Sequence, residues 1–168
     1  VSFKKLKDIL LQTKIPIISI NKVLQWTIFN LIIGNSDAHG KNLSFFISKE
    51  GISLTPFYDI LNILIYDGVF NTELAMAIDD EFVIKNISSY DIASFSYMLQ
   101  SNPQIANKEF TNISNTLLKI FKDSPLIDIC KKYDDNFTNL YIKDVENRVE
   151  FLKPIFQNAV KIKKDEVV

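Results

Sequence analysis

Between two strongly hydrophobic stretches of this 168-residue chain lies the polar sequence GNSDAHGKN, residues 34–42. Asn, Ser, Asp and Gly favour turns, so this segment is expected to form a loop and not a regular element. Gly34 suits the left-handed conformation that commonly ends a helix. A loop held by a rigid helix leaves its side chains free to meet a ligand. Residues 34–42 are therefore the first place to look for chemistry.

Two helices are expected before this loop. Residues 3–10 place hydrophobic side chains at helical spacing with lysines on the opposite side, and Pro16 is expected to end that helix. A second hydrophobic stripe predicts a helix that begins near Ser19 or Asn21, both suitable caps, and continues to Gly34.

After the loop the sequence predicts a small β-insertion and then a helical remainder. Residues 43–47 and 52–54 are expected to form a hairpin around a turn at 48–51, and the acidic turn at 79–81 suggests a second one. The sequence predicts hairpin strands at 74–78 and 82–87, helices at about 90–100, 108–122, 126–133 and 140–160, a break or kink at Pro154, and a charged, frayed tail at 161–168.

The composition fits one globular domain. Hydrophobic residues make up 47% and charged residues 23%, and the net charge of −1 gives no sign of a nucleic-acid or membrane surface. The apolar run around residues 31–33 is expected to be too short to span a bilayer, and no signal peptide is evident, so we expect a cytoplasmic protein. The single cysteine, Cys130, excludes an intramolecular disulfide and is expected to be a buried thiol, not a catalytic one.

The spacing of three polar residues suggests phosphoryl transfer. Asp37 and Asn42 are five positions apart, and Asp59 follows Asn42 by seventeen, beyond the expected hairpin. Phosphoryl transfer needs a carboxylate that orients and deprotonates a hydroxyl, and separate hard oxygen ligands for Mg²⁺. The catalytic loop of protein kinases has the same offset of five from Asp to Asn, with a later Asp on the metal.

Other interpretations of these residues are open. Asp37 and Asn42 would also suit a plain turn, and Asp59 a helix cap. His39, the only histidine, and Lys41, a cation beside the expected phosphates, favour a functional loop. A helical metal protein that uses Asp37, His39 and Asp59 is a further alternative, but one histidine and one cysteine leave a closed zinc site short of ligands.

Two motifs at this separation closely resemble the catalytic segment of the HipA-like serine/threonine kinases, the toxins of bacterial toxin–antitoxin pairs. The first is the loop G-x-x-D-x-H-x-K-N-x-S and the second is L-x-P-x-Y-D. The positions that match them here are Gly34, Asp37, His39, Lys41, Asn42 and Ser44, then Leu54, Pro56, Tyr58 and Asp59. The likeness covers most of the chain and is strongest over residues 24–78.

The resemblance implies a fold and a division of the chain. It implies a mainly α fold with a small β-hairpin insertion, the C-terminal lobe of a protein-kinase-like fold, over residues 1–168. Within it, residues 34–44 would form the catalytic loop, 54–60 the metal-binding segment and 89–160 the helical remainder.

The resemblance also implies roles for individual residues, with ATP and Mg²⁺ as cofactors. Asp37 would be the catalytic base, and Asn42 and Asp59 would bind Mg²⁺. His39 is expected to shape the loop by hydrogen bonding, with direct phosphate contact as the alternative. Lys41 would either steady the γ-phosphate or remain solvated.

A complete kinase also needs a β-rich lobe that holds ATP. The four glycines are isolated, and nothing before Asp37 is long enough to form that lobe. We therefore expect an N-terminal lobe to be supplied from the same or a separate chain, and the isolated chain to fold without useful activity. The resemblance further implies a protein substrate, such as an aminoacyl-tRNA synthetase, and a HipB-like antitoxin. The alternative is an inactive remnant or a module that binds an antitoxin or a separate lobe.

Overall fold

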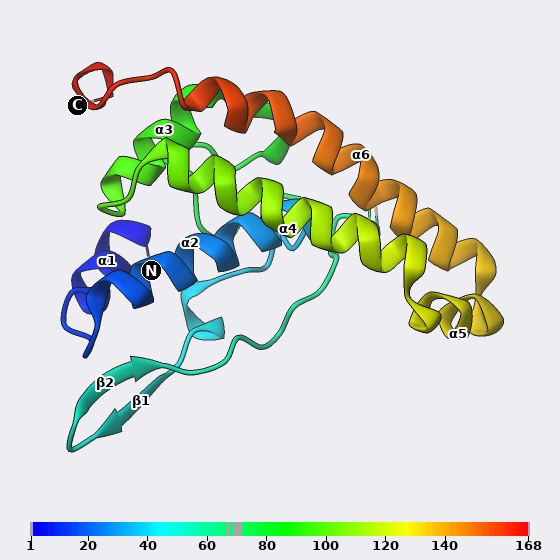
Figure 1. Cartoon of the computed structure of the whole chain (residues 1–168), viewed down its shortest axis with the longest axis horizontal. Helices are drawn as coiled ribbons and strands as arrows, with labels where there is room; N and C mark the ends of the chain where they lie inside the picture. Colours follow the sequence, from blue (N-terminus) through cyan, green and yellow to red (C-terminus); the bar gives the residue numbers. More distant parts are fainter. Residues whose placement is uncertain (1, 67, 69–71, 168) are drawn as a thin grey trace.

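A computed structural model describes residues 2–66, 68 and 72–167 of the chain, and Figure 1 shows its arrangement. This part is mainly helical with one two-stranded antiparallel hairpin, which confirms the predicted fold class. The elements in chain order are α1 (Phe3–Leu10), α2 (Pro16–Ile33), η1 (Gly40–Asn42), β1 (Phe45–Ser48), β2 (Gly51–Leu54), η2 (Ile84–Asn86), α3 (Ser89–Met98), α4 (Pro103–Asp123), α5 (Pro125–Tyr133), α6 (Asp135–Ala159) and η3 (Lys164–Glu166), where η marks a short 3₁₀ helix.

Helix α2 begins earlier than the sequence predicted. Pro16 was expected to end the first helix, but α1 already ends at Leu10 and Pro16 opens α2. Proline suits the first position of a helix because its N–H has no partner there and its fixed φ is already helical. The predicted stop is confirmed, since Gly34 follows α2 with a φ of 78°.

Helix α2 is longer than the apolar run around residues 31–33, which was expected to be too short to span a bilayer. Its 18 residues have a mean hydropathy of 1.3, so by length and composition alone it could cross a membrane. In this fold 61% of those residues are buried inside the protein, as in the core helix of a globular domain.

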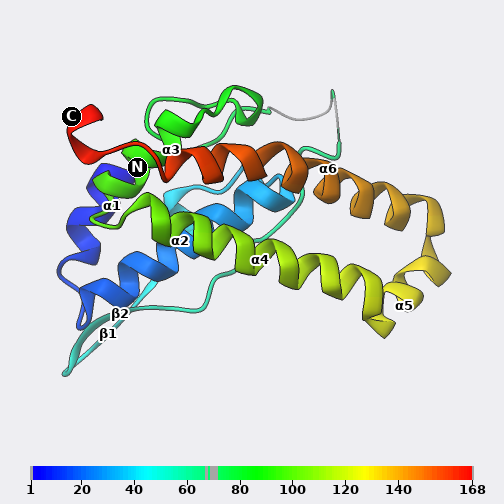
Figure 2. The same cartoon turned by 45° about the horizontal axis from the view of Figure 1, so that its top comes forward.

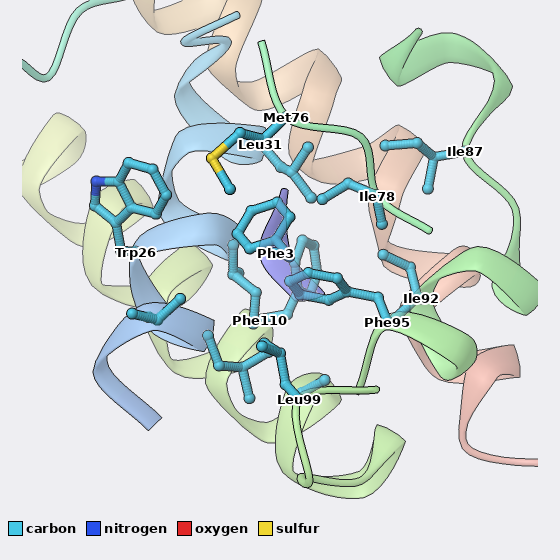
Figure 3. Packing of buried hydrophobic residues seen from close by; sticks show 14 of the residues in the cluster. Phe3, Trp26, Leu31, Met76, Ile78, Ile87, Ile92, Phe95, Leu99 and Phe110 are labelled. Carbon is cyan, nitrogen blue, oxygen red and sulfur yellow. The ribbon is translucent and has the colours of Figure 1, made fainter. Parts of the chain in front are cut away.

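The core forms where α4 and α6 pack on α2 and α3 packs on α4 and α6, with α4 and α6 lying alongside each other (Figures 1 and 2). The rings of Phe110 on α4 and Phe156 on α6 stack with centroids 4.5 Å apart. Phe3 of α1 meets Phe95 of α3 edge to face at 4.8 Å, which joins α1 to the same core (Figure 3). Such aromatic pairs add about 0.5–1.5 kcal/mol each beyond the area that they bury.

The hairpin is present as predicted but projects away from the helices (Figures 1 and 2). Phe45 pairs with Leu54 and Ser48 with Gly51 around a two-residue turn, so β1 begins two residues later than expected. The backbone N–H of Lys14 donates to the carbonyl of Ile52 (2.8 Å), which ties β2 to the segment between α1 and α2.

The second predicted hairpin does not form. A single β-bridge joins Ile78 to Glu81, and Asp79 turns the chain with a φ of 56°. Leu74, Met76 and Ile78 bury their side chains in the core, where Figure 3 shows Met76 and Ile78 near Leu31 of α2. The Leu74 N–H also donates to the Phe82 carbonyl (2.7 Å), but no regular ladder forms here among the described residues. The apolar face of the segment packs against α2, and its burial is worth more than an isolated two-stranded ladder.

The helical remainder is confirmed, with longer helices than predicted. Helix α4 starts at Pro103 and α6 at Asp135, five residues earlier than expected in each case. Helix α6 is one continuous element through Pro154. Pro154 lies on the exposed side, where water can satisfy the carbonyl that proline leaves without a donor.

Two further expectations were wrong. The tail is not frayed throughout, since the Tyr97 hydroxyl donates to the Ile162 carbonyl (3.0 Å) and Val167 packs against the core. Cys130 is exposed, not buried. Cys130 lies on α5, which packs on the end of α4 and α6 as a short surface helix. All residues of α5 are described and none of them is buried, so this cysteine is exposed too.

Candidate catalytic site

The predicted loop is fixed directly to the end of α2. The backbone N–H groups of Gly34 and Asn35 both donate to the carbonyl of Asn30 (2.9 Å each). The Asn35 side chain donates to Asn30 Oδ1 (2.8 Å), and the Asn30 side chain donates to the carbonyl of Trp26 (2.8 Å). These bonds satisfy buried polar groups at the helix end and hold the start of the loop in one position.

Asn42 and Asp59 lie in contact although seventeen residues separate them. The Asn42 side-chain amide donates to Asp59 Oδ2. Asn42 is 3% exposed and closes the short helix η1, and its Oδ1 accepts the backbone N–H of His39 (3.0 Å). The predicted loop and the predicted metal-binding segment therefore meet at these two side chains.

Asp59 adopts a conformation that few residues tolerate. Its φ is 58°, in the left-handed region that Asp and Asn enter more readily than other side chains. Its carbonyl accepts the Asn35 side-chain amide (3.3 Å), so the same asparagine bonds to α2 and to this segment. The backbone turns here in a way that leaves the carboxylate exposed beside Asn42.

Tyr58 stabilises the later part of the loop, at Lys41 and Ser44, by hydrogen bonds. Its hydroxyl donates to the Lys41 carbonyl (2.9 Å) and lies 2.8 Å from Ser44 Oγ, so with its one proton used it accepts from the serine. The sequence placed Tyr58 only in the second motif and gave no sign of this role. Its neighbour Phe57 does pack, with its ring 6.1 Å from that of Trp26.

Of the remaining predicted residues, Asp37 and Lys41 face solvent and His39 is half-buried. The Asp37 side chain is 66% exposed, and His39 Nε2 lies 4.0 Å from Asp37 Oδ1. This pair attracts only when the imidazole is protonated. The Lys41 side chain is exposed and forms no ion pair within the part of the chain that the structure describes. An exposed carboxylate, an exposed ammonium and a half-buried imidazole thus line one loop next to the Asn42–Asp59 contact.

The donor set suits Mg²⁺ better than a transition metal. No group of three or more His, Cys, Asp or Glu side chains that could hold a metal occurs among the described residues. Asp59 and Asn42 offer a carboxylate and an amide oxygen, and the Asn42 oxygen keeps a second lone pair beside its bond to His39. Mg²⁺ takes hard oxygen ligands and commonly completes its shell with water and substrate phosphates, so two protein groups are enough.

Behind the loop lies an ion pair between the buried Arg148 and the partly buried Asp144, which the sequence did not lead us to predict. Arg148 on α6 donates to Asp144 Oδ2 from both terminal nitrogens (2.9 and 2.6 Å) and to the Ile32 carbonyl (3.4 Å). Burial lowers the pKa of Arg148, and Asp144 opposes that shift. The same carboxylate oxygen accepts the side-chain amide of Asn62 (2.8 Å). One signal was available, because Arg148 is the only arginine in the sequence.

The family is shown by a comparison with protein-family models. Residues 1–124 match the HipA-like C-terminal domain. The chain belongs to this family. The match includes the loop, the hairpin and the segment with Asp59, and it ends at the boundary between α4 and α5.

Two curated relatives of this HipA-like domain support the assignment. The chain is 44% identical over 95 residues to the serine/threonine-protein kinase toxin HipA of Shewanella oneidensis, a match to 56% of this chain and 22% of that protein. It is 29% identical over 98 residues to the putative kinase Y4mE of Sinorhizobium fredii, a match to 58% of this chain and 23% of that protein. The matched part is thus less than a quarter of either relative.

A solved structure extends the likeness to α5 and α6. The structure of HipA and HipB with operator DNA from the Shewanella oneidensis toxin–antitoxin system includes a chain that superposes with a TM-score of 0.85 at 31% identity. That superposition covers 97% of this HipA-like domain and 38% of the solved chain. The helix that carries Arg148 and Asp144 is therefore part of the shared fold, although it lies outside the family-model match.

Proposed function

We propose that this HipA-like domain is the catalytic lobe of a serine/threonine protein kinase that transfers the γ-phosphate of ATP to a protein hydroxyl. The observation that carries the proposal is the contact between Asn42 and Asp59 next to the exposed carboxylate of Asp37. The 44% identity to a protein named a serine/threonine-protein kinase toxin supports the same reaction.

In this proposal each site residue has one task. Asp37 orients the substrate hydroxyl and takes its proton, for which an exposed carboxylate at the loop surface is suited. Asn42 and Asp59 hold Mg²⁺ through oxygen atoms, and the ion, when bound, offsets the negative charge of the phosphates. His39 sets the loop conformation through its backbone bonds to Asn42, and Lys41 is free to approach a phosphate.

The proposal includes partners that lie outside this chain. Residues 1–168 would act as one lobe, with the loop at 34–44, the metal-binding segment at 54–60 and the helical remainder at 89–160. An ATP-holding N-terminal lobe would come from the same or a separate chain. A HipB-like antitoxin is a proposed partner because the similar solved structure contains HipA with HipB. An aminoacyl-tRNA synthetase is the proposed type of substrate, and the cytoplasm the proposed location.

The test is phosphate transfer by the intact gene product. Labelled ATP and Mg²⁺ would be supplied to the unaltered protein and to its Asp37→Asn and Asp59→Asn variants. Asn tolerates the left-handed φ at position 59, so this change removes the negative charge without straining the backbone. Asp165→Asn, an exposed carboxylate in η3, is the matched control.

We expect incorporation of label by the unaltered protein and by the control, and its loss in both site variants. No incorporation by an intact, folded protein together with its N-terminal lobe would reject the kinase function. The domain would then be assigned to binding an antitoxin or a separate lobe.

A further inference from the structure

The only arginine of the chain is buried behind the candidate site. The other basic side chains are lysines, whereas Arg148 is 9% exposed and lies on α6. A buried ion pair is expensive to desolvate, and a hydrophobic pair of similar volume commonly gives equal or greater stability. Stability alone therefore does not explain why a guanidinium occupies this position.

Arg148 contacts the point where α2 becomes the loop. It donates to the Ile32 carbonyl (3.4 Å), and a Cβ on Gly34 would lie only 2.7 Å from its guanidinium. Helix α2 has no basic residue in its own last turn, so Arg148 supplies from α6 the positive charge that stabilises a helix C-terminus. The start of the catalytic loop therefore rests on this side chain.

Asp144 extends the same contact to the segment beyond Asp59. Its Oδ2 accepts both Arg148 and the Asn62 side-chain amide (2.8 Å). Asn62 is 7% exposed, and its own Oδ1 accepts the backbone N–H of Ile65 (3.1 Å). One carboxylate oxygen thus joins the helix that supports the loop to the chain that follows the metal-binding segment.

The two segments also bond directly to each other at this place. The backbone N–H groups of Ile63 and Leu64 both donate to the carbonyl of Gly34 (3.0 and 3.1 Å). These two hydrogen bonds form beside the Arg148 guanidinium, which fills the space next to Gly34. If Arg148 leaves, both the position of Gly34 and the anchor of Asn62 are lost together.

We propose that Arg148 and Asp144 are positioning residues, which set the distance between the loop with Asn42 and the segment with Asp59. They touch neither substrate nor metal and act through Gly34 and Asn62. The kinetic part of this inference rests on the proposed kinase function, whereas the positional part does not.

The experiment compares Arg148→Met with Lys153→Met in the intact gene product. Lys153 is exposed on the same helix, so the control removes a cation of α6 without touching the ion pair. Amide hydrogen exchange would be followed at Ile63, Leu64 and Ile65, whose N–H bonds depend on Gly34 and Asn62. Phosphate transfer would be measured against ATP and against Mg²⁺ concentration.

In Arg148→Met we expect exchange at these three amides to accelerate at least about tenfold more than exchange at the amides of α4, which reports the loss of overall stability. The Mg²⁺ concentration for half-maximal activity should rise by about tenfold, with a smaller change in the KM for ATP. Arg148→Lys keeps the charge but has a single nitrogen, so it should restore part of both effects.

Three results would contradict this inference or one part of it. Exchange that rises evenly over the whole domain, or stays unchanged at residues 63–65, would show a merely structural role and overturn the inference. An unchanged Mg²⁺ dependence in an active variant would do the same. If Arg148→Met does not fold, Asp144→Asn and Arg148→Lys provide the same two readouts. If the unaltered protein transfers no phosphate, the kinase function fails and the exchange measurement alone decides the positioning role.

Discussion

The two sides of the loop after α2 differ in almost every physical respect. On the outer side, Asp37 and Lys41 present charged groups to solvent, with the half-buried His39 between them. On the inner side, Gly34 and Arg148 are buried, close together and tied by hydrogen bonds to elements far along the chain. A single short segment thus has an outer side available for chemistry and an inner side that fixes its position.

This difference predicts that the two sides respond to substitution in opposite ways. Exposed charges contribute little to the free energy of unfolding, because water already solvates them. Buried paired groups contribute strongly, since removal of one partner leaves the other desolvated and unpaired. Variants of the outer side should therefore lose activity and keep stability, and variants of the inner side should lose stability first.

Asp37→Asn should give the strongest effect of the outer side. If Asp37 takes the proton of the attacking hydroxyl, its loss should lower the rate of phosphate transfer by about 10²–10⁴-fold. Its side chain is 66% exposed, so the free energy of unfolding should change by less than about 0.5 kcal/mol. Phosphorylation rates and urea unfolding of the intact protein check both numbers. A stability loss comparable to the activity loss would remove the distinction between the two sides.

Gly34→Ala should give the strongest effect of the inner side. The positive φ of 78° strains an alanine, and its Cβ would lie 2.7 Å from the Arg148 guanidinium, which must move. Left-handed strain of about 1–2 kcal/mol and a disturbed buried ion pair together predict a stability loss of about 3 kcal/mol.

Gly68→Ala is the matched control for this glycine. Its φ is 74°, close to that of Gly34, and no atom of the described residues lies within 4 Å of an added Cβ. Strain without a clash should cost about 1–2 kcal/mol in urea unfolding. Equal losses at positions 34 and 68 would mean that the contact with Arg148 contributes nothing.

The outer side could be predicted from the sequence, whereas on the inner side only Gly34, as the end of the helix, could. Turn-forming residues after a hydrophobic helix placed the loop, and the two motifs around the hairpin predicted that Asn42 and Asp59 come together. Both inferences depend on residues that are close in sequence or separated by one short hairpin, whose geometry is simple.

The contacts of Arg148 depend on how α6 crosses α2, and 116 residues separate Arg148 from Ile32. No local pattern determines such a crossing. The sequence also misplaced the exposed Cys130 and the segment at 74–78, because local hydrophobicity does not say which apolar face finds a partner. Local residue propensity predicted the helices and the hairpin, whereas long-range packing determined which of their faces are buried.

Tyr58→Phe removes a contact that supports the loop, and it should change stability and activity less than the substitutions above. Loss of the hydroxyl removes the bonds to the Lys41 carbonyl and Ser44 Oγ, at a cost of about 0.5–1.5 kcal/mol in the free energy of unfolding. The less constrained loop should transfer phosphate more slowly, by less than about tenfold. Tyr133→Phe, at a side chain that is 89% exposed, is the control and should change neither quantity. Identical behaviour of the two variants would show that this contact has no effect on the loop.

The free energy of unfolding should also depend on pH in alkaline solution, because of Tyr141 near Arg148 on the inner side. Burial raises the pKa of Tyr141 above its ordinary value of 10.0, while the charge of Arg148 opposes the rise and that of Asp144 adds to it. Above pH 10 the unfolded chain therefore releases this proton before the folded protein does. The folded state then binds more protons, so the free energy of unfolding falls as the pH rises toward the pKa of the folded state.

Tyr141→Phe removes this contribution and should lose less stability than the unaltered protein between about pH 8 and pH 11 in urea unfolding. Asp37→Asn carries its change on the outer side and should follow the unaltered protein over the same range. A parallel fall in all three proteins would assign the alkaline sensitivity to other groups. A smaller fall in Tyr141→Phe alone would locate it beside Arg148, on the buried side where a charge costs most and where the loop is held.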